Sequence, residues 1–256
     1  MFLINHSWLQ IFQHFLEWFR SRFPYYYDRC DTCGASAKDE PALEKQQDAD
    51  DISCDNDDEE EDDNGTFLGY VYPSKEELVG KASRTEIYQC HKCGSFTRFP
   101  RYNSASSIIR NKRGRCGEYS MLLYRILRAT GHTCRWIVDW ADHVWAEVRL
   151  NGHWIHLDPC EAAVNKPLLY EEWGKQQTYI VAFHAPLARR FEATSILNGH
   201  RRVTEAVPLI EDVTLRYTSS DQETIRKRRD ESEEELRTFM ERTIVDLERK
   251  LDGILR

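Results

Sequence analysis

The stretch Gly114-Arg115-Cys116-Gly117-Glu118 sets a cysteine, flanked closely by glycines, directly before a predicted helix. Apolar residues then recur at helical spacing, at Tyr119, Leu122, Leu123, Ile126 and Leu127. The start of a helix is the positive end of its dipole, and the neighbouring arginine adds a second positive charge, so both favour thiolate over thiol. The stretch therefore predicts a nucleophilic cysteine. A buried structural cysteine is the alternative, because most free cysteines are small core residues.

After this helix the pattern changes to the alternation typical of strands. Three strands are predicted, over residues 133–140, 143–150 and 153–158. Asn151-Gly152 separates the last two and is the strongest short signal for a two-residue hairpin turn. Such a turn determines the register of the hairpin. The predicted opposed pairs are Leu150 with His153, Arg149 with Trp154, Glu147 with His156, Trp145 with Asp158, and His143 with Cys160.

This register divides the hairpin into two faces. The predicted core face carries Val144, Ala146, Val148, Leu150, Ile155 and Leu157. On the other face His143 and Asp158 are diagonal neighbours, about 7–8 Å apart between backbones and within side-chain reach. If the helix that carries Cys116 packs against this sheet, a Cys–His–Asp arrangement results. A satisfied surface pair of histidine and aspartate is the alternative.

The same face offers candidate groups for binding a ligand. Aromatic rings and polar anchors beside the His–Asp pair predict a binding cleft, with Arg135 added from the neighbouring strand. The candidates are Arg135, Trp145, Glu147 and Trp154. Tryptophan packing and a simple ion pair of Glu147 with Arg149 or a lysine are the alternatives.

Two CxxC pairs predict a metal site: Cys30-Asp31-Thr32-Cys33-Gly34 and Cys90-His91-Lys92-Cys93-Gly94. Each pair presents two thiolates on one tight turn, and four such sulfurs suit one tetrahedral Zn²⁺ with no open position, which indicates a structural ion. The pairs are far apart in sequence, but residues from about 39 to 65 are acidic and are predicted to form a disordered insertion. Two disulfides or free thiols are the alternatives.

Composition excludes few functions. The net charge is −8, but residues 44–63 hold twelve acidic residues and one lysine, so the rest of the chain is slightly basic. Such a balance neither requires nor forbids nucleic acid, and we expect none as a partner. No run is apolar enough to span a membrane, and no signal peptide is recognisable. Together with the CxxC pairs, this predicts a reducing compartment, the cytoplasm or alternatively the nucleus.

Amphipathic helices are predicted at both ends of the chain. Residues 2–20 carry an apolar stripe that we expect to dock on the core; a membrane-surface helix is the alternative, although its polar face has few cations. Its stripe consists of Phe12, Phe15, Leu16 and Phe19. A final helix over about 222–252 is expected to pack against the first, or alternatively to bind a partner. Its stripe consists of Leu236, Met240, Ile244, Leu247 and Leu251.

Several strings resemble the transglutaminase-like cysteine hydrolases and, more narrowly, the cytoplasmic peptide:N-glycanases. The resemblance runs from roughly Phe12 to Tyr217 and includes the CxxC pairs. Besides the stretch around Cys116, its strings are Arg98-Phe99-Pro100-Arg101-Tyr102-Asn103, Asp142-His143-Val144-Trp145, His156-Leu157-Asp158-Pro159-Cys160-Glu161, Pro167-Leu168-Leu169-Tyr170-Glu171, Trp173-Gly174-Lys175 and Asp212-Val213-Thr214-Leu215-Arg216-Tyr217.

The resemblance implies an α+β fold: a transglutaminase-like, papain-like core with a four-cysteine zinc-binding lobe and terminal helices. We expect a docked helix in 1–29, the zinc lobe in 30–103 with its insertion at about 39–65, the catalytic core in 104–220 and a helix in 221–256. Compared with the family, we expect a longer acidic loop and neither the N-terminal adaptor domain nor the C-terminal sugar-binding domain of animal members.

The implied activity is hydrolysis of the amide that joins an N-glycan to asparagine in misfolded glycoproteins, as in ER-associated degradation. Cys116 would form a thioester, His143 would act as acid and then base, and Asp158 would orient the imidazole. The Cys116 amide is a candidate oxyanion donor. Family members also imply a ubiquitin-receptor shuttle protein of the proteasome as a partner of the terminal helices. A transglutaminase that uses an amine in place of water, or a non-catalytic protein-binding module, are the alternatives.

Overall fold

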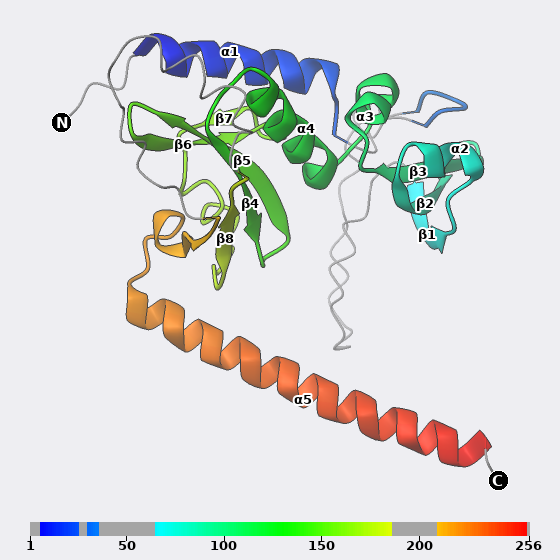
Figure 1. Ribbon diagram of the computed structural model, residues 1–256. Helices are drawn as coiled ribbons and strands as arrows, with labels where there is room; N and C mark the ends of the chain where they lie inside the picture. The colour runs from blue at the N-terminus through cyan, green and yellow to red at the C-terminus, as the bar shows by residue number, and fades with distance from the viewer. Residues whose placement is uncertain (1–5, 26–29, 36–64, 186–208, 255–256) are drawn as a thin grey trace, which may run out of the picture. The chain divides into compact units, whose positions relative to one another are not determined.

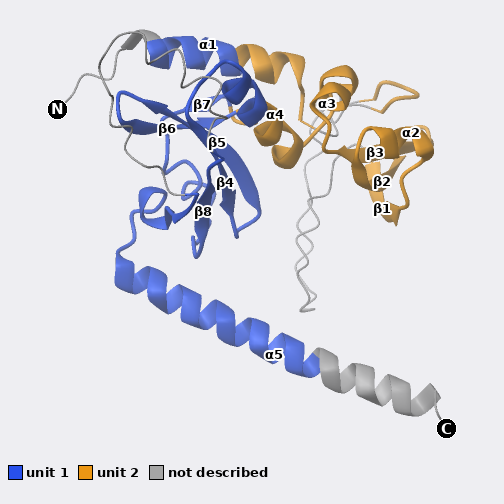
Figure 2. Ribbon diagram, in the orientation of Figure 1, with its two compact units in different colours: residues 1–16, 123–158, 162–256 blue, residues 17–122, 159–161 orange. Residues whose placement is uncertain are grey.

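The computed structural model describes residues 6–25, 30–35, 65–185 and 209–254, with side chains described between residues 8 and 242 of these ranges. The chain divides into two compact units (Figure 2): residues 1–16, 123–158 and 162–256 form the first, and residues 17–122 and 159–161 the second. Two of the boundaries between the units fall inside helices, α1 (His6–Arg22) and α4 (Cys116–Ala129). The four expected segments stay a prediction. The predicted acidic insertion at about 39–65 lies almost wholly outside the described residues.

The first unit is built on an antiparallel sheet with the order β7-β6-β5-β4-β8-β9 (Figure 1). After the sheet come the short 3-10 helix η4 (Thr214–Arg216) and the long helix α5 (Gln222–Ile254). The strands are β4 (Cys134–Asp139), β5 (His143–Leu150), β6 (His153–Asp158), β7 (Ala163–Val164), β8 (Ile180–Phe183) and β9 (Ile210–Asp212).

The predicted hairpin of β5 and β6 is confirmed, with its register, as far as the ladder extends; the predicted pairs Trp145 with Asp158 and His143 with Cys160 lie beyond its last pair. Leu150 pairs with His153, and the ladder continues in step through Glu147 with His156 to Ala146 with Leu157. Asn151 and Gly152 both have positive φ, of 49° and 85°. This is the conformation that a tight hairpin turn of the I′ type requires and that asparagine and glycine tolerate best.

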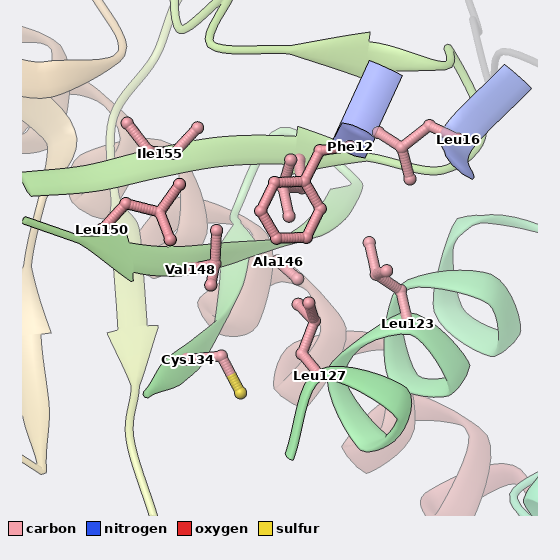
Figure 3. Close-up of a cluster of buried hydrophobic side chains, with 10 residues drawn as sticks. Phe12, Leu16, Leu123, Leu127, Cys134, Ala146, Val148, Leu150 and Ile155 are labelled. Atoms are coloured by element: carbon pink, nitrogen blue, oxygen red, sulfur yellow. The ribbon is translucent and has the colours of Figure 1, made fainter. Parts of the chain in front are cut away.

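One face of the sheet is covered by two helices, as the sequence predicts. Phe12 and Leu16 of α1 and Leu123 and Leu127 of α4 pack on a patch of strand residues (Figure 3). The strand side chains of this cluster are Cys134, Ala146, Val148, Leu150, Ile155 and Leu157. The apolar stripe of each helix faces this patch because burial of apolar surface is the main favourable term in folding. The N-terminal helix is thus docked on the core.

The opposite face of the sheet is buried as well. A second apolar cluster forms there, on the face for which the sequence predicts a binding cleft. Tyr170 follows β7 and Tyr217 follows η4, so the side chains that cover this face come from segments far along the chain. Its members are Ile137, Trp145, Tyr170, Ile180, Ala182, Val213 and Tyr217.

The second unit contains a three-stranded antiparallel sheet in the order β1-β2-β3 and the start of α4. Ser74 and Glu77 form a capping box at the start of α2, which satisfies backbone N–H groups of its first turn. The elements before α4 are β1 (Gly65–Val71), α2 (Lys75–Val79), β2 (Ala82–Cys90), β3 (Phe96–Tyr102) and α3 (Ala105–Asn111).

Helix α5 does not use the predicted stripe for packing in the part whose side chains are described. Leu236 and Met240 are 58% and 54% exposed, so the expected contact with the N-terminal helix is wrong for them. The helix is attached instead through its first turns, where Ile225 is buried and Arg229 donates to the carbonyl of Thr178 at 2.8 Å. The remaining stripe residues, Ile244, Leu247 and Leu251, lie outside the side chains that the structure describes.

Candidate active site

His143 and Asp158 form a buried hydrogen-bonded pair in the first unit. His143 is the first residue of β5 and Asp158 the last of β6, so the hairpin register brings them to the same end of the sheet. Nε2 of His143 lies 2.7 Å from Oδ2 of Asp158. Since this nitrogen is engaged by the carboxylate, Nδ1 is the ring nitrogen that would exchange a proton with a substrate.

Asp158 is a carboxylate despite complete burial. Burial by itself raises its pKa, but hydrogen bonds from His143 and Tyr170 and the nearby histidine rings lower it, and the net pKa lies below the usual value. The Tyr170 hydroxyl donates to Oδ2 at 2.9 Å. A buried carboxylate with such donors keeps its charge at neutral pH and can stabilise a protonated imidazole beside it.

Aromatic rings hold the imidazole of His143 in place. Its centroid lies 5.0 Å from that of Tyr170, 5.3 Å from Trp173 and 5.8 Å from Trp145. Packing of this kind restricts ring rotation, because side chains in a dense interior occupy single rotamers. His143 is therefore pre-oriented as well as hydrogen-bonded.

Cys116 is the first residue of α4 and lies in the second unit. The preceding N–H, of Arg115, donates to Oε2 of Glu118 at 3.0 Å. This is the backbone half of a capping box, in which an acidic residue of the first turn closes back on the residue before the helix. Gly114 is required here, because a Cβ at that position would lie 2.7 Å from Cβ of Glu118.

A network of charges supports this first turn. Arg101 of β3 donates to Glu118 at 2.8 Å and to Glu86 of β2 at 2.8 Å. The guanidinium of Arg115 lies 3.5 Å from Glu86 and donates to the hydroxyl of Tyr88. The positive charge that the sequence places beside the cysteine is thus paired with a carboxylate of the adjoining sheet.

The four cysteines of the CxxC pairs come together, and a metal ion fits among them. Their sulfurs all lie within 4.8 Å of one another. Cys30 Sγ is 3.7 Å from Cys93 Sγ, and Cys33 Sγ is 3.8 Å from Cys90 Sγ. Sulfurs bound tetrahedrally to one zinc ion at about 2.3 Å would be about 3.8 Å apart. The cluster can therefore hold a metal ion with zinc geometry.

The sequence also matches a known protein family. The profile of the Transglutaminase-like superfamily core matches residues 70–159, a span that contains Cys116, His143 and Asp158. The chain has a transglutaminase-like domain.

The chain is also similar in sequence to several peptide-N(4)-(N-acetyl-beta-glucosaminyl)asparagine amidases. The protein of Gallus gallus is 36% identical over 187 residues, covering 70% of this chain and 28% of the relative. That of Caenorhabditis briggsae is 35% identical over 213 residues, 81% of this chain and 27% of the relative. That of Saccharomyces cerevisiae is 39% identical over 123 residues, 47% of this chain and 34% of the relative. The chain is thus a homologue of the peptide:N-glycanases, and the matched stretches span about a third or less of these relatives.

Three residues expected to bind a ligand on the transglutaminase-like sheet are instead part of its interior. Trp145, Glu147 and Arg135 are almost completely buried. Arg135 donates to Glu147, Tyr217 donates to Glu147 at 2.6 Å, and Trp145 donates to Tyr217 at 2.9 Å. Arg216 adds an ion pair with Glu147 at 3.1 Å. Glu147, Tyr217 and Trp145 are thus engaged with one another, whereas Nη2 of Arg135 is buried without a hydrogen-bond partner.

Trp154 differs from these three, because it keeps part of its surface exposed. The guanidinium of Arg135 lies 4.2 Å from its ring centroid, and that of Arg149 lies 5.8 Å from it. Arg216 also donates to its backbone carbonyl at 2.9 Å. Of the four predicted ligand-binding side chains, Trp154 is the one that the structure leaves accessible.

Sequence reasoning did not assign a role to Tyr170 or His156, although both contribute to the transglutaminase-like site. His156 was placed on the correct face of the hairpin, and Tyr170 lies in one of the family-like strings. Nothing in the local pattern shows that Tyr170 reaches back to Asp158.

No helix in the described part of the chain has the length and apolar content needed to cross a bilayer.

Proposed function

We propose that this chain is the catalytic core of a deglycosylating amidase, which hydrolyses the bond between an N-glycan and asparagine. The observation that carries the proposal is the similarity to named amidases over a region that includes a buried His–Asp pair and a helix-start cysteine. The proposed catalytic residues are Cys116 as the nucleophile, His143 as the acid and base, and Asp158 as the group that orients His143.

In this mechanism Cys116, as thiolate, attacks the side-chain carbonyl carbon of the glycosylated asparagine. The C–N bond breaks, His143 gives a proton from Nδ1 to the leaving glycosylamine, and a thioester remains. His143 then takes a proton from water, whose oxygen attacks the thioester; the C–S bond breaks, the Cys116 thiolate leaves, and the new carboxyl group loses its proton to solvent to give aspartate. Asp158 holds the tautomer of the imidazole and stabilises its charged form in both steps.

The backbone N–H of Cys116 is the proposed oxyanion donor. It stands at the first turn of α4, where backbone N–H groups have no partner within the helix. Glu118 and Arg101 hold this turn from the side of the sheet. The donor is therefore preorganised for the charge that develops on the attacked carbonyl oxygen.

The metal of the proposed enzyme is one structural Zn²⁺, bound by Cys30, Cys33, Cys90 and Cys93. The sulfur–sulfur distances support this ion, and four thiolates complete its coordination. The ion supplies folding energy to the second unit when bound.

The proposed substrates are misfolded glycoproteins, because the asparagine must be accessible to a thiolate at a helix start. Trp154 remains the candidate for contact with the sugar. A ubiquitin-receptor shuttle protein is the proposed partner of the terminal helices, supported by the exposed Leu236, Phe239 and Met240 of α5. The proposed location is the cytoplasm, with the nucleus as the alternative.

Incubation with a denatured glycoprotein in H₂¹⁸O tests the function. We expect glycan release, with asparagine converted to aspartate that carries one ¹⁸O, and no release by Cys116→Ala. Incorporation of a labelled amine into protein glutamine would indicate a transglutaminase instead. Full release by Cys116→Ala, or no release by protein with one bound zinc per chain, would contradict the proposal.

A further inference from the structure

Asp158 accepts a second hydrogen bond at the oxygen that binds His143. The hydroxyl of Tyr170 donates to Oδ2 at 2.9 Å, beside the 2.7 Å contact from Nε2 of His143. The Tyr170 oxygen in turn lies 2.6 Å from Nε2 of His156. All four side chains are at least nine-tenths buried. A chain of hydrogen bonds thus runs from His156 through Tyr170 to the carboxylate of the proposed triad.

The direction of this chain follows from the backbone around His156. The N–H of Lys166 donates to Nδ1 of His156 at 3.4 Å, so Nδ1 is an acceptor and the ring proton is on Nε2. Nε2–H therefore donates to the Tyr170 oxygen, and the hydrogen of Tyr170 is directed at Asp158. Burial lowers the pKa of His156 to about 4, which keeps this ring neutral near pH 7.

Packing fixes the ring of Tyr170, and with it the position of the hydroxyl that donates to Asp158. Its ring stacks on Trp145 with centroids 4.4 Å apart, and Trp173 meets it edge-on at 5.1 Å. A hydroxyl on a ring held this way is a preorganised donor, unlike a mobile solvent molecule.

We propose that Tyr170 and His156 are positioning residues of the amidase, and that they limit how strongly Asp158 holds the His143 imidazolium. A carboxylate oxygen that accepts two hydrogen bonds is less basic toward each donor than one that accepts a single bond. His143 must hand its proton to the leaving glycosylamine, and an imidazolium that is held too strongly is a weaker acid. The expected change in amidase kinetics rests on the proposed function, whereas the hydrogen-bond chain from His156 to Asp158 rests on the geometry alone.

Other charged groups lie near His143 and His156, and a substitution of Tyr170 does not remove any of them. Asp139 of β4 is the cross-strand partner of His143, and Lys175 lies near Asp139. Arg216 lies near His156. A difference between the wild type and a variant that lacks only the Tyr170 hydroxyl therefore reports that hydroxyl.

The kinetic test uses Tyr170→Phe in the full chain. We expect kcat to fall roughly tenfold, as for loss of one hydrogen bond to a charged group, with little change in KM. The alkaline limb of the kcat/KM profile should move to higher pH, because Asp158 then holds the imidazolium more strongly. His156→Leu should move the limb in the same direction, and His156→Gln should restore it, because the Gln amide can donate to Tyr170.

Tyr217→Phe is the matched control. It removes another buried hydroxyl of the same cluster, one that donates to Glu147 rather than Asp158. Its melting temperature should fall, but the alkaline limb should stay where it is in the wild type. A Tyr170→Phe protein with a lower melting temperature and an unshifted limb would overturn the proposal, since the hydroxyl would then be merely structural.

An NMR measurement separates this proposal from the proposed function. In ¹⁵N-histidine-labelled full chain we expect His156 to keep the Nε2–H tautomer and stay neutral down to pH 5. We also expect the titration of His143 to move to higher pH in Tyr170→Phe. Failure of the wild type to release glycan would reject the amidase and leave these two results as the test. The proposed hydrogen-bond chain would be overturned by a His156 protonated on Nδ1. It would also be overturned if His143 titrated at the same pH in Tyr170→Phe as in the wild type.

Discussion

Asp158 shows how one residue acquires its chemistry from position. It ends β6, is completely buried, and still has a pKa below the usual range, because two donors compensate for lost solvent. In return it selects the tautomer of His143 by accepting from Nε2. An amide at this position would have nearly the same shape but could present an N–H to the imidazole.

We therefore expect Asp158→Asn to fold and to lose most of the proposed amidase activity. The variant removes the negative charge and favours the wrong tautomer, and the fall in kcat should be on the order of 10³ to 10⁴, as for other Cys/Ser–His–Asp enzymes. Single-turnover glycan release measures the effect, and near-ultraviolet circular dichroism checks the fold. A fall of less than about tenfold would show that Asp158 does not orient the base.

At the scale of elements, the start of α4 depends on a sheet that the metal site closes. Glu118 caps the helix and is held by Arg101 of β3, which also binds Glu86 of β2. The turn from Cys90 to Cys93 joins these two strands and supplies two of the four cysteines that could hold a metal ion. The four-cysteine cluster and Cys116, the proposed nucleophile, are therefore connected through β2 and β3, within one unit.

Metal removal should consequently loosen the first turn of α4. After chelation we expect faster amide hydrogen exchange in β2, β3 and at Arg115, with β5 and β6 protected as before, because their core cluster is separate. Cys93→Ser should reproduce the pattern, whereas Cys134→Ser, a cysteine of that other core cluster, should not. Unchanged exchange at Arg115 in metal-free protein would show that the turn is independent of the site.

Over the whole molecule, chains of buried polar side chains occupy one face of the large sheet. His156–Tyr170–Asp158 and Trp145–Tyr217–Glu147 each join a strand side chain to a carboxylate through a tyrosine. Such networks stabilise a fold only while every member is satisfied. They also make stability depend on pH.

Stability should fall as pH falls from about 6.5 to about 4 because of His156. Its pKa is about 4 in the folded chain against 6.5 for an ordinary histidine, so the unfolded chain binds the extra proton in this window. The loss can reach about 3 kcal/mol at the acid end. Urea unfolding followed by tryptophan fluorescence at pH 7, 5.5 and 4.5 measures it. The difference in unfolding free energy between wild type and His156→Gln should shrink with acid, and parallel pH dependences would refute the assignment.

Local chemistry determined much of this protein from its sequence. The Asn151-Gly152 turn and a period of two specify the β5–β6 register, and with it the meeting of His143 with Asp158. Helical periodicity specifies which side of α1 is buried, and each CxxC turn specifies one pair of neighbouring sulfurs. These features depend on backbone geometry over a few residues, which a sequence pattern records directly.

Only the tertiary structure decided what covers the second face of the sheet. The sequence pattern marks that face as polar, which is equally compatible with solvent, a ligand or a buried network. Tyr170 and Tyr217 come from distant segments and donate to Asp158 and Glu147. Three of the four predicted ligand-binding side chains are therefore buried, and Trp154 keeps part of its surface exposed. Burial of polar groups depends on which long-range partners complete their hydrogen bonds, and no local pattern encodes that choice.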